Sequence, residues 1–148
     1  MSDPVVVDAS LATKWLVDEV QSELAYALAH SWVEAGTQPV APCLMPIEVA
    51  NALHRRVLRG ERSPNEATEL LDALVGSGID LMEPPQIHTT ALGLARQLGQ
   101  DAVYDSHYLA LAEAIDAELW RADQRFQQAA ASGQYGRVRW LGEFARRV

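Results

Sequence analysis

Valines fill positions 5–7 with no polar residue between them, and Asp8 follows at once. A strand with one face in water alternates apolar and polar residues, whereas a parallel strand covered on both faces does not. The pattern therefore predicts a buried parallel strand over residues 5–7. Ligand sites in open α/β sheets form beyond the carboxyl ends of strands, so Asp8 is well placed for chemistry. Taken alone, Asp8 is more simply explained as the N-cap of the next helix.

The rest of the chain alternates between short apolar runs and segments in which apolar residues recur three or four positions apart. The short runs predict four further strands, at residues 39–41, 79–82, 118–120 and 138–141. The periodic segments predict helices, at residues 11–17, 23–34, 46–59, 64–75, 87–98 and 104–115. Strands that alternate with helices indicate a mainly parallel five-stranded sheet covered on both faces, which is an α/β fold. No repeat or linker divides the sequence, so we expect one domain over residues 1–148.

Composition narrows the class of protein further. The chain has a formal net charge of −8, which argues against a general nucleic-acid coat protein but leaves room for a nuclease that meets phosphate through metal ions and a few arginines. Lys14 is the only lysine, and the other basic residues are arginines, which suit bidentate phosphate contacts. The single cysteine, Cys43, offers no intramolecular disulfide, and no apolar run reaches membrane-spanning length. We therefore expect a soluble, cytoplasmic protein with no membrane partner.

Four acids occupy comparable places in the predicted elements. Asp8 follows the first strand, Glu48 falls in the first turn of the helix after the second strand, Asp105 opens the helix before the fourth strand, and Asp123 follows that strand at the start of another helix. Each has a simpler explanation, because an acid near a helix N-terminus offsets the macrodipole and Asp is a favoured N-cap. All four acids lie at the same end of the predicted parallel sheet, and this predicts that one crevice holds them.

Carboxylates gathered in one crevice repel one another unless cations neutralise them or one takes up a proton. Oxygen-only ligands select hard cations, so Mg²⁺ or Mn²⁺ fits better than zinc. A metal ion held by carboxylates with open water positions can activate water and stabilise charge on a phosphodiester. Asn51, one helical turn after Glu48, would face the same side and could hold that carboxylate or a metal-bound water; an ordinary surface amide is the alternative.

Four segments in order resemble the motifs of PIN domains, and specifically those of VapC-type toxins of bacterial toxin–antitoxin pairs. The first runs Val-Val-Val-Asp-Ala-Ser over residues 5–10, and the second runs Pro-Ile-Glu-Val-Ala-Asn-Ala-Leu over residues 46–53. The third, Tyr-Asp-Ser-His-Tyr-Leu-Ala-Leu-Ala, covers residues 104–112, and the fourth, Ala-Asp-Gln-Arg-Phe, covers residues 122–126. Together the four segments span nearly the whole chain.

The resemblance implies a three-layer α/β/α fold and a Mg²⁺- or Mn²⁺-dependent endoribonuclease that hydrolyses RNA. Its catalytic acids would be Asp8, Glu48, Asp105 and Asp123, of which the three aspartates would hold metal. It also implies a cognate VapB-type antitoxin, a DNA-binding protein whose tail blocks the site, and commonly a toxin homodimer. In the family, the residue at Ser10 helps to hold the first acid or a metal-bound water; a helix N-cap is the simpler role.

Arginines raise two further questions. The family usually has Thr or Ser two residues before the last aspartate, where this chain has Arg121. Positions two apart share a strand face, so one hypothesis is that Arg121 points toward the acids and competes with metal; the alternative is a surface arginine that leans into solvent. Arg55, Arg56 and Arg59 belong to the densest basic stretch and could guide RNA, although a solvated helix face is the commoner use of such a stretch.

Two other readings compete with the metal-dependent nuclease. The first is a catalytically weak protein of the same fold that acts only by binding antitoxin or RNA, and Arg121 is the feature that supports it. The second is a receiver-type signalling domain, which also gathers acids around Mg²⁺. That class expects a lysine after a late strand, and Lys14 follows the first strand instead.

Overall fold

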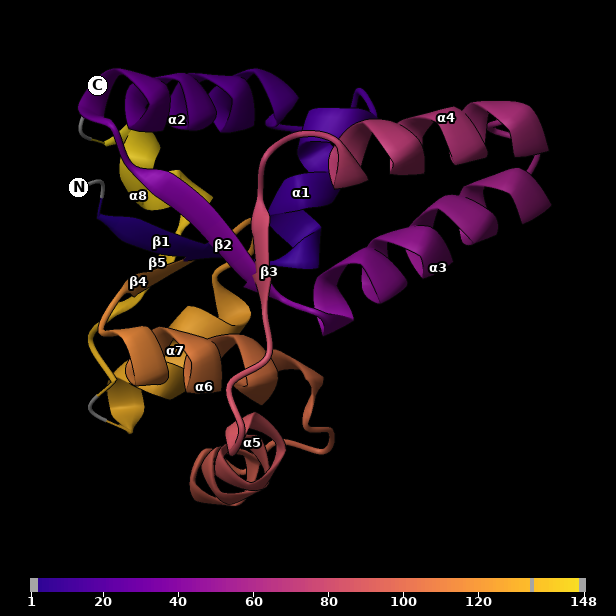
Figure 1. Cartoon of the computed structure of the whole chain (residues 1–148). Helices are drawn as coiled ribbons and strands as arrows, with labels where there is room; N and C mark the ends of the chain where they lie inside the picture. The colour runs from indigo at the N-terminus through magenta and orange to yellow at the C-terminus, as the bar shows by residue number, and fades with distance from the viewer. Residues whose placement is uncertain (1–2, 134, 147–148) are drawn as a thin grey trace.

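The centre of the fold is a five-stranded sheet in which every pair of neighbouring strands is parallel (Figure 1). The computed structural model describes residues 3–133 and 135–146. In chain order the strands are β1 (Pro4–Val7), β2 (Gln38–Pro42), β3 (Asp80–Met82), β4 (Glu118–Arg121) and β5 (Val138–Trp140). In space their order is β3-β2-β1-β4-β5. The predicted α/β fold is confirmed, and the predicted first strand lies in the middle of the sheet.

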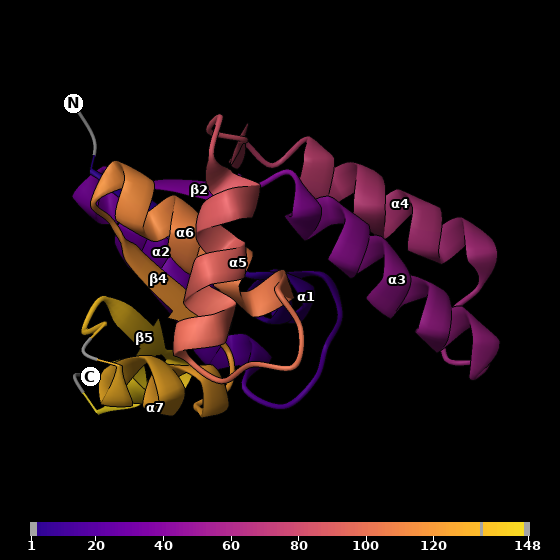
Figure 2. The same ribbon diagram turned by 90° about the horizontal axis from the view of Figure 1, so that it is seen from below.

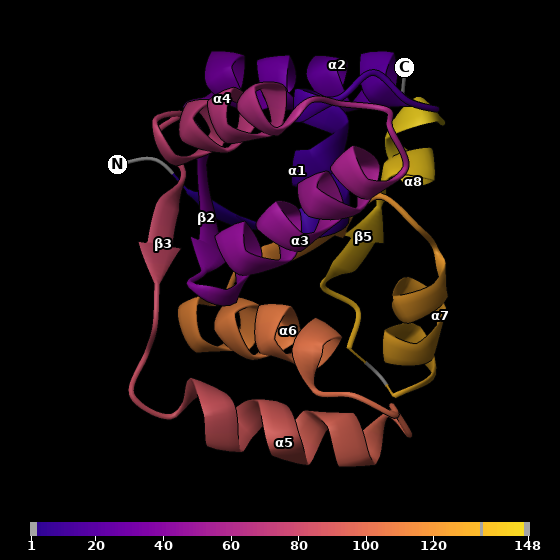
Figure 3. The ribbon, with the colours of Figure 1, turned by 90° about the vertical axis from the view of Figure 1, so that its right-hand side faces the viewer.

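Helices cover both faces of the sheet and give the three layers that the motifs imply (Figure 3). On one face lie α1 (Ala9–Leu16), α2 (Ser22–Ala35) and α8 (Leu141–Ala145). On the other face α6 (Tyr104–Ile115) packs against β1, β2 and β4, with α5 (Ile87–Gln97) outside it. The remaining helix of this half, α7 (Arg125–Ser132), lies beside the edge strand β5. Among the described residues, no helix combines the length and apolar character needed to cross a bilayer.

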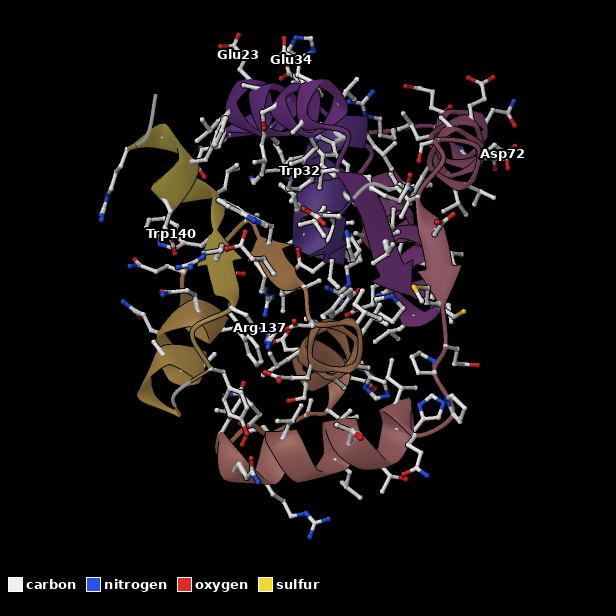
Figure 4. The ribbon with its side chains drawn as sticks, turned by 60° about the vertical axis from the view of Figure 1, so that its left-hand side comes forward. Glu23, Trp32, Glu34, Asp72, Arg137 and Trp140 are labelled. Atoms are coloured by element: carbon white, nitrogen blue, oxygen red, sulfur yellow. The ribbon has the colours of Figure 1, made fainter. Side chains whose placement is uncertain are left out.

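Burial explains why β1 carries no polar residue. The side chains of Val5, Val6 and Val7 are at most 3% exposed, because helices pack on both sides of the strand. Tryptophans extend this core toward α2: the ring of Trp32 meets the rings of Trp15 and Trp120 edge-on, at centroid distances of 6.1 and 6.4 Å. Figure 4 shows Trp32 pointing from α2 into the protein, whereas Glu23 and Glu34 lie on the outer side of the same helix.

The two helices α3 (Leu44–Leu58) and α4 (Pro64–Val75) form a hairpin that extends away from the sheet (Figure 2). The predicted cap of α4 is present: the Ser63 hydroxyl accepts a hydrogen bond from the backbone N–H of Glu66, and the Glu66 carboxylate accepts one from the N–H of Ser63. Pro64 is the first helical residue, where its missing N–H leaves no bond unmade.

Three predicted boundaries need correction. Helix α3 begins at Leu44 and not at residue 46, so Glu48 lies in its second turn; Pro46 is tolerated inside the first turn because the N–H groups there have no intrahelical acceptor. Leu141 begins α8 and is not the last residue of β5. Asp123 lies two residues before α7 begins at Arg125, and its carboxylate accepts a hydrogen bond from the Arg125 backbone N–H.

Candidate active site

The first acid, Asp8, ends the central strand and is buried, with only 2% of its surface exposed. Its Oδ1 accepts a hydrogen bond from the backbone N–H of Leu11 at 3.0 Å, so Asp8 is the N-cap of α1 as well as a member of the acid cluster. Burial raises the pKa of the Asp8 carboxyl above its ordinary value, although the charge of Arg121 opposes that rise. A buried carboxylate of this kind needs a cation or a proton close by.

Ser10 fixes the orientation of Asp8. Its hydroxyl lies 2.8 Å from Oδ1 and 2.9 Å from Oδ2 of Asp8, to which it donates, and it accepts a hydrogen bond from the backbone N–H of Ala122 at 3.1 Å. Ser10 is the second residue of α1, so it is not the helix N-cap; that position belongs to Asp8. The serine therefore ties the end of β1 to the end of β4, the two strands that carry Asp8 and Arg121.

Arg121 points into the acid cluster. Its Nε lies 2.7 Å from Oδ2 of Asp8, its Nη1 lies 3.1 Å from Oδ1 of Asp105, and its Nη2 lies 3.7 Å from Oδ2 of Asp123. Only 7% of the Arg121 side chain is exposed, against 42% for Asp105 and 57% for Asp123. Burial lowers the pKa of the guanidinium, but the three carboxylates outweigh burial and raise it, so Arg121 stays charged.

The remaining acid, Glu48, is held by a tyrosine that the sequence analysis did not single out. The Tyr108 hydroxyl donates a short hydrogen bond to Oε1 of Glu48, and the tyrosine is 1% exposed. Burial raises the pKa of the Glu48 carboxyl, a rise that the Tyr108 bond opposes and that the charges of Asp8 and Asp105 reinforce. Burial and the Glu48 charge raise the pKa of Tyr108 as well, so the phenol remains a donor.

A sequence signal for Tyr108 did exist. It lies three residues after Asp105 on α6, which places the two side chains on neighbouring parts of one helix face. A buried tyrosine in a helix of alanine and leucine also needs a partner for its hydroxyl.

A pocket of about 330 Å³ opens beside these acids. Glu48 and Asn51 line it from α3, and Ser10 lines it from α1. Arg55 lies on its rim one turn after Asn51, and no ion pair to Arg55 occurs among the described residues. Asn51 and Glu48 therefore face the same side, as predicted, and that side is the one that lines this pocket.

The other arginines of the basic stretch contact acids on the surface. Arg56 forms ion pairs with Glu19 and Glu61, and Arg59 lies 2.9 Å from Glu61. These contacts leave Arg55 as the member of the predicted RNA-binding set that lines the pocket and forms no ion pair among residues 3–133 and 135–146.

The chemistry of the donor set suits a hard divalent cation, because the acids offer only oxygen. The Arg121 guanidinium lies within 3.7 Å of Asp8, Asp105 and Asp123, so these three carboxylates surround a single cation. As they stand around Arg121, however, the described residues include no group of three or more His, Cys, Asp or Glu close enough together to hold a metal ion. Between α5 and α6, Nδ1 of His88 and Nε2 of His107 lie 3.0 Å apart, a pairing that sequence spacing did not reveal.

Comparison with known proteins relates this chain to one family. The PIN domain family model matches residues 5–132. Ribonuclease VapC1 of Mycobacterium tuberculosis is 35% identical over 133 residues, which cover 88% of this chain and 92% of the relative. Ribonuclease VapC3 of Pyrobaculum aerophilum is 31% identical over 126 residues, 84% of this chain and 92% of the relative. The crystal structure of PAE2754 from Pyrobaculum aerophilum has a TM-score of 0.68 and 20% identity, and covers 98% of this chain and 88% of that one, which shows a shared fold.

The parallel sheet between two layers of helices and the acids beyond its strand ends are the features that define the class of protein. The chain belongs to the PIN domain family and is homologous to the VapC ribonucleases, as its motifs predicted.

Proposed function

We propose that this protein is a metal-dependent endoribonuclease toxin that hydrolyses RNA phosphodiester bonds. The observation that carries the proposal is the contact of Asp8, Asp105 and Asp123 with one cation, together with Glu48 in the lining of the adjoining pocket. The homology to proteins named as ribonucleases supports RNA as the substrate. In this proposal residues 1–148 form one PIN domain, and the protein works in the cytoplasm.

The three aspartates would hold Mg²⁺ or Mn²⁺, and Glu48 would act on the attacking water. A bound divalent cation supplies a lowered pKa of water and stabilisation of charge on phosphate. Since Oε1 of Glu48 accepts the Tyr108 hydrogen bond, Oε2 is the atom that takes the proton from water. The raised pKa of Glu48 brings its basicity closer to that of a general base at neutral pH.

Other side chains orient these groups or receive the RNA. Ser10 holds Asp8 at a fixed rotation through its two contacts and its bond to the Ala122 N–H. Asn51 would hold a water or a ribose hydroxyl in the pocket, and Arg55 would contact the RNA backbone.

The proposed partners follow from the homology to VapC proteins. We expect a cognate VapB-type antitoxin to bind the protein and block the acid cluster, and we expect the toxin to form a homodimer. Addition of the antitoxin should reduce the rate of RNA cleavage in proportion to the amount of complex formed.

The test is cleavage of total cellular RNA by the purified, antitoxin-free protein in Mg²⁺ or Mn²⁺, beside EDTA and an Asp105→Asn variant. Discrete fragments that disappear with EDTA and with Asp105→Asn support the proposal. Cleavage that persists in Asp105→Asn identifies a contaminating nuclease and counts against it.

A second candidate function has one observation in its favour, which is that Arg121 occupies the volume between the acids. A protein whose metal position stays filled by arginine would act only by binding antitoxin or RNA. In that case the purified protein binds RNA but neither binds Mn²⁺ nor cleaves at any metal concentration.

A further inference from the structure

We propose that Arg121 is a built-in counter-cation that occupies the metal position of the metal-free protein, and that metal binds only when the guanidinium is displaced. This inference rests on the proposed function, because it assumes that the acid cluster is the metal site. It deepens that function by naming a residue of this chain that sets the affinity of the site for metal.

The contacts of Arg121 coincide with the proposed metal ligands. The guanidinium reaches Asp8, Asp105 and Asp123, each through a different nitrogen and at 2.7, 3.1 and 3.7 Å respectively. Two of these carboxylates also stand partly in solvent, so they could meet an arriving metal without unfolding of the site. Metal and guanidinium would therefore compete for the same oxygens.

Charge and proximity hold the guanidinium more than hydrogen-bond alignment does. Although Nε and Nη1 lie within 3.1 Å of carboxylate oxygens, neither buried nitrogen has a well-aligned hydrogen-bond acceptor among the described residues. An ion pair without directed hydrogen bonds is easier for a divalent cation to replace, because the carboxylates lose a less specific partner.

The backbone of Arg121 is fixed while its side chain has an alternative support. Arg121 pairs with Trp140 in the β4–β5 ladder, so displacement must occur by side-chain rotation. The guanidinium carbon already lies 5.0 Å from the centre of the Phe126 ring, a cation–π contact that does not depend on the acids. Phe126 can therefore keep part of the contact with the arginine as the acids pass to metal.

The net charge of the cluster explains the direction of the effect. The three aspartates carry a formal charge of −3, which Arg121 reduces to −2, so the metal-free site is partly neutralised without metal. A metal ion can bind the carboxylates only where the Arg121 guanidinium now lies. It is also repelled by the positive charge of that guanidinium while the arginine stays nearby. Removal of Arg121 should therefore strengthen metal binding but weaken the metal-free fold.

The experiment is calorimetric titration of Mn²⁺ into wild type, Arg121→Thr and Arg121→Gln, paired with thermal unfolding in EDTA and in Mn²⁺. We expect the Mn²⁺ Kd to fall about tenfold or more in both variants. We also expect a lower unfolding midpoint in EDTA and a larger rise in that midpoint with Mn²⁺. A residue with a purely structural role would lower the midpoint without strengthening metal binding.

Arg139→Thr is the matched control, since it removes one arginine from the neighbouring strand β5 whose ion pairs are with Glu118 and Glu143. Its Mn²⁺ Kd should equal that of wild type. If Arg121→Thr fails to fold, Arg121→Gln keeps a longer, polar and uncharged side chain and gives the same comparison.

The outcomes separate this proposal from the function on which it rests. Equal or weaker Mn²⁺ binding in the Arg121 variants overturns the counter-cation and leaves the nuclease standing. Absence of Mn²⁺ binding in wild type and in both variants overturns the metal site itself, and with it both proposals. Adding Asp105→Asn to Arg121→Thr should abolish the tightened binding, which ties the effect to the acid cluster.

Discussion

Two arginine–carboxylate ion pairs in this protein have similar distances between their charged atoms but differ in how far they are exposed to solvent. Arg121 lies 2.7 Å from Asp8, with 7% and 3% of the two side chains exposed. Arg59 lies 2.9 Å from Glu61 beside the α3–α4 hairpin, with 56% and 45% exposed. In water a pair of this kind contributes little, whereas loss of one buried partner leaves a charge that solvent does not reach. Burial, and not distance, therefore decides which arginine matters.

The largest expected difference is in the stability of the metal-free protein. Arg121→Gln should lower the free energy of unfolding in EDTA by about 3 kcal/mol, because it leaves Asp8 buried beside other acids. Arg59→Gln removes the same charge from the surface and should change stability too little to resolve. Urea unfolding of both variants measures the difference, and equal losses would show that burial is not the cause.

Within the site, loss of the Tyr108 hydroxyl should lower kcat/KM for RNA about tenfold, as expected for a group that positions a general base. The hydrogen bond from Tyr108 lowers the pKa of Glu48, so Tyr108→Phe should raise that pKa and move the acidic limb of the pH–rate profile to higher pH. Tyr135→Phe is the control, because the Tyr135 hydroxyl donates its hydrogen bond to Gln97 and not to one of the four acids. A lower rate with an unmoved profile contradicts the assignment of Glu48.

A smaller effect is expected where arginine meets RNA. Arg55→Gln should raise KM about threefold and reduce the dependence of log KM on log salt by about one phosphate contact. Arg59→Gln should leave both unchanged, because Glu61 already engages that guanidinium. Cleavage of a short RNA at several salt concentrations measures both variants, and an equal change in the two would remove the special position of Arg55.

The two regions should also differ in the sign of their pH dependence. Burial raises the pKa of Glu48 above its ordinary 4.5, so its contribution to stability is present below that value and is lost as pH rises through the folded pKa. The hydrogen bond from Arg59 lowers the pKa of Glu61, so that contribution is present above 4.5 and is lost as pH falls through the folded pKa.

Unfolding midpoints in EDTA from about pH 4 to pH 8 test these signs. Relative to wild type, Glu48→Gln should gain stability as pH rises, and Glu61→Gln should lose a small amount of it. The same sign for both variants would contradict the two environments described above.

Much of the fold could be predicted from residues that are close in sequence. The three valines of β1, the capping box at Ser63 and the alternation of strands with helices are local signals, and each is present in the structure. For Arg121 the sequence left two directions open, toward the acids or into solvent, and the structure shows the first.

Contacts between distant segments could not be read in the same way. Tyr108 and Glu48 are 60 residues apart, and the packing of both α6 and α3 against the sheet brings them together. The ion pairs of Arg56 with Glu19 depend likewise on how α3 lies beside α1. Figure 4 shows a further example in Arg137, the residue before β5, which lies beside α6 and pairs with Glu113.

The measurement that tests the central claim most directly is the crystal structure of the protein grown with Mn²⁺, with anomalous scattering used to locate the metal. We predict one or more peaks among Asp8, Asp105 and Asp123, with the Arg121 guanidinium moved out of contact with at least two of them. Manganese bound only elsewhere, such as at His88 and His107, with Arg121 still between the acids, would contradict the account.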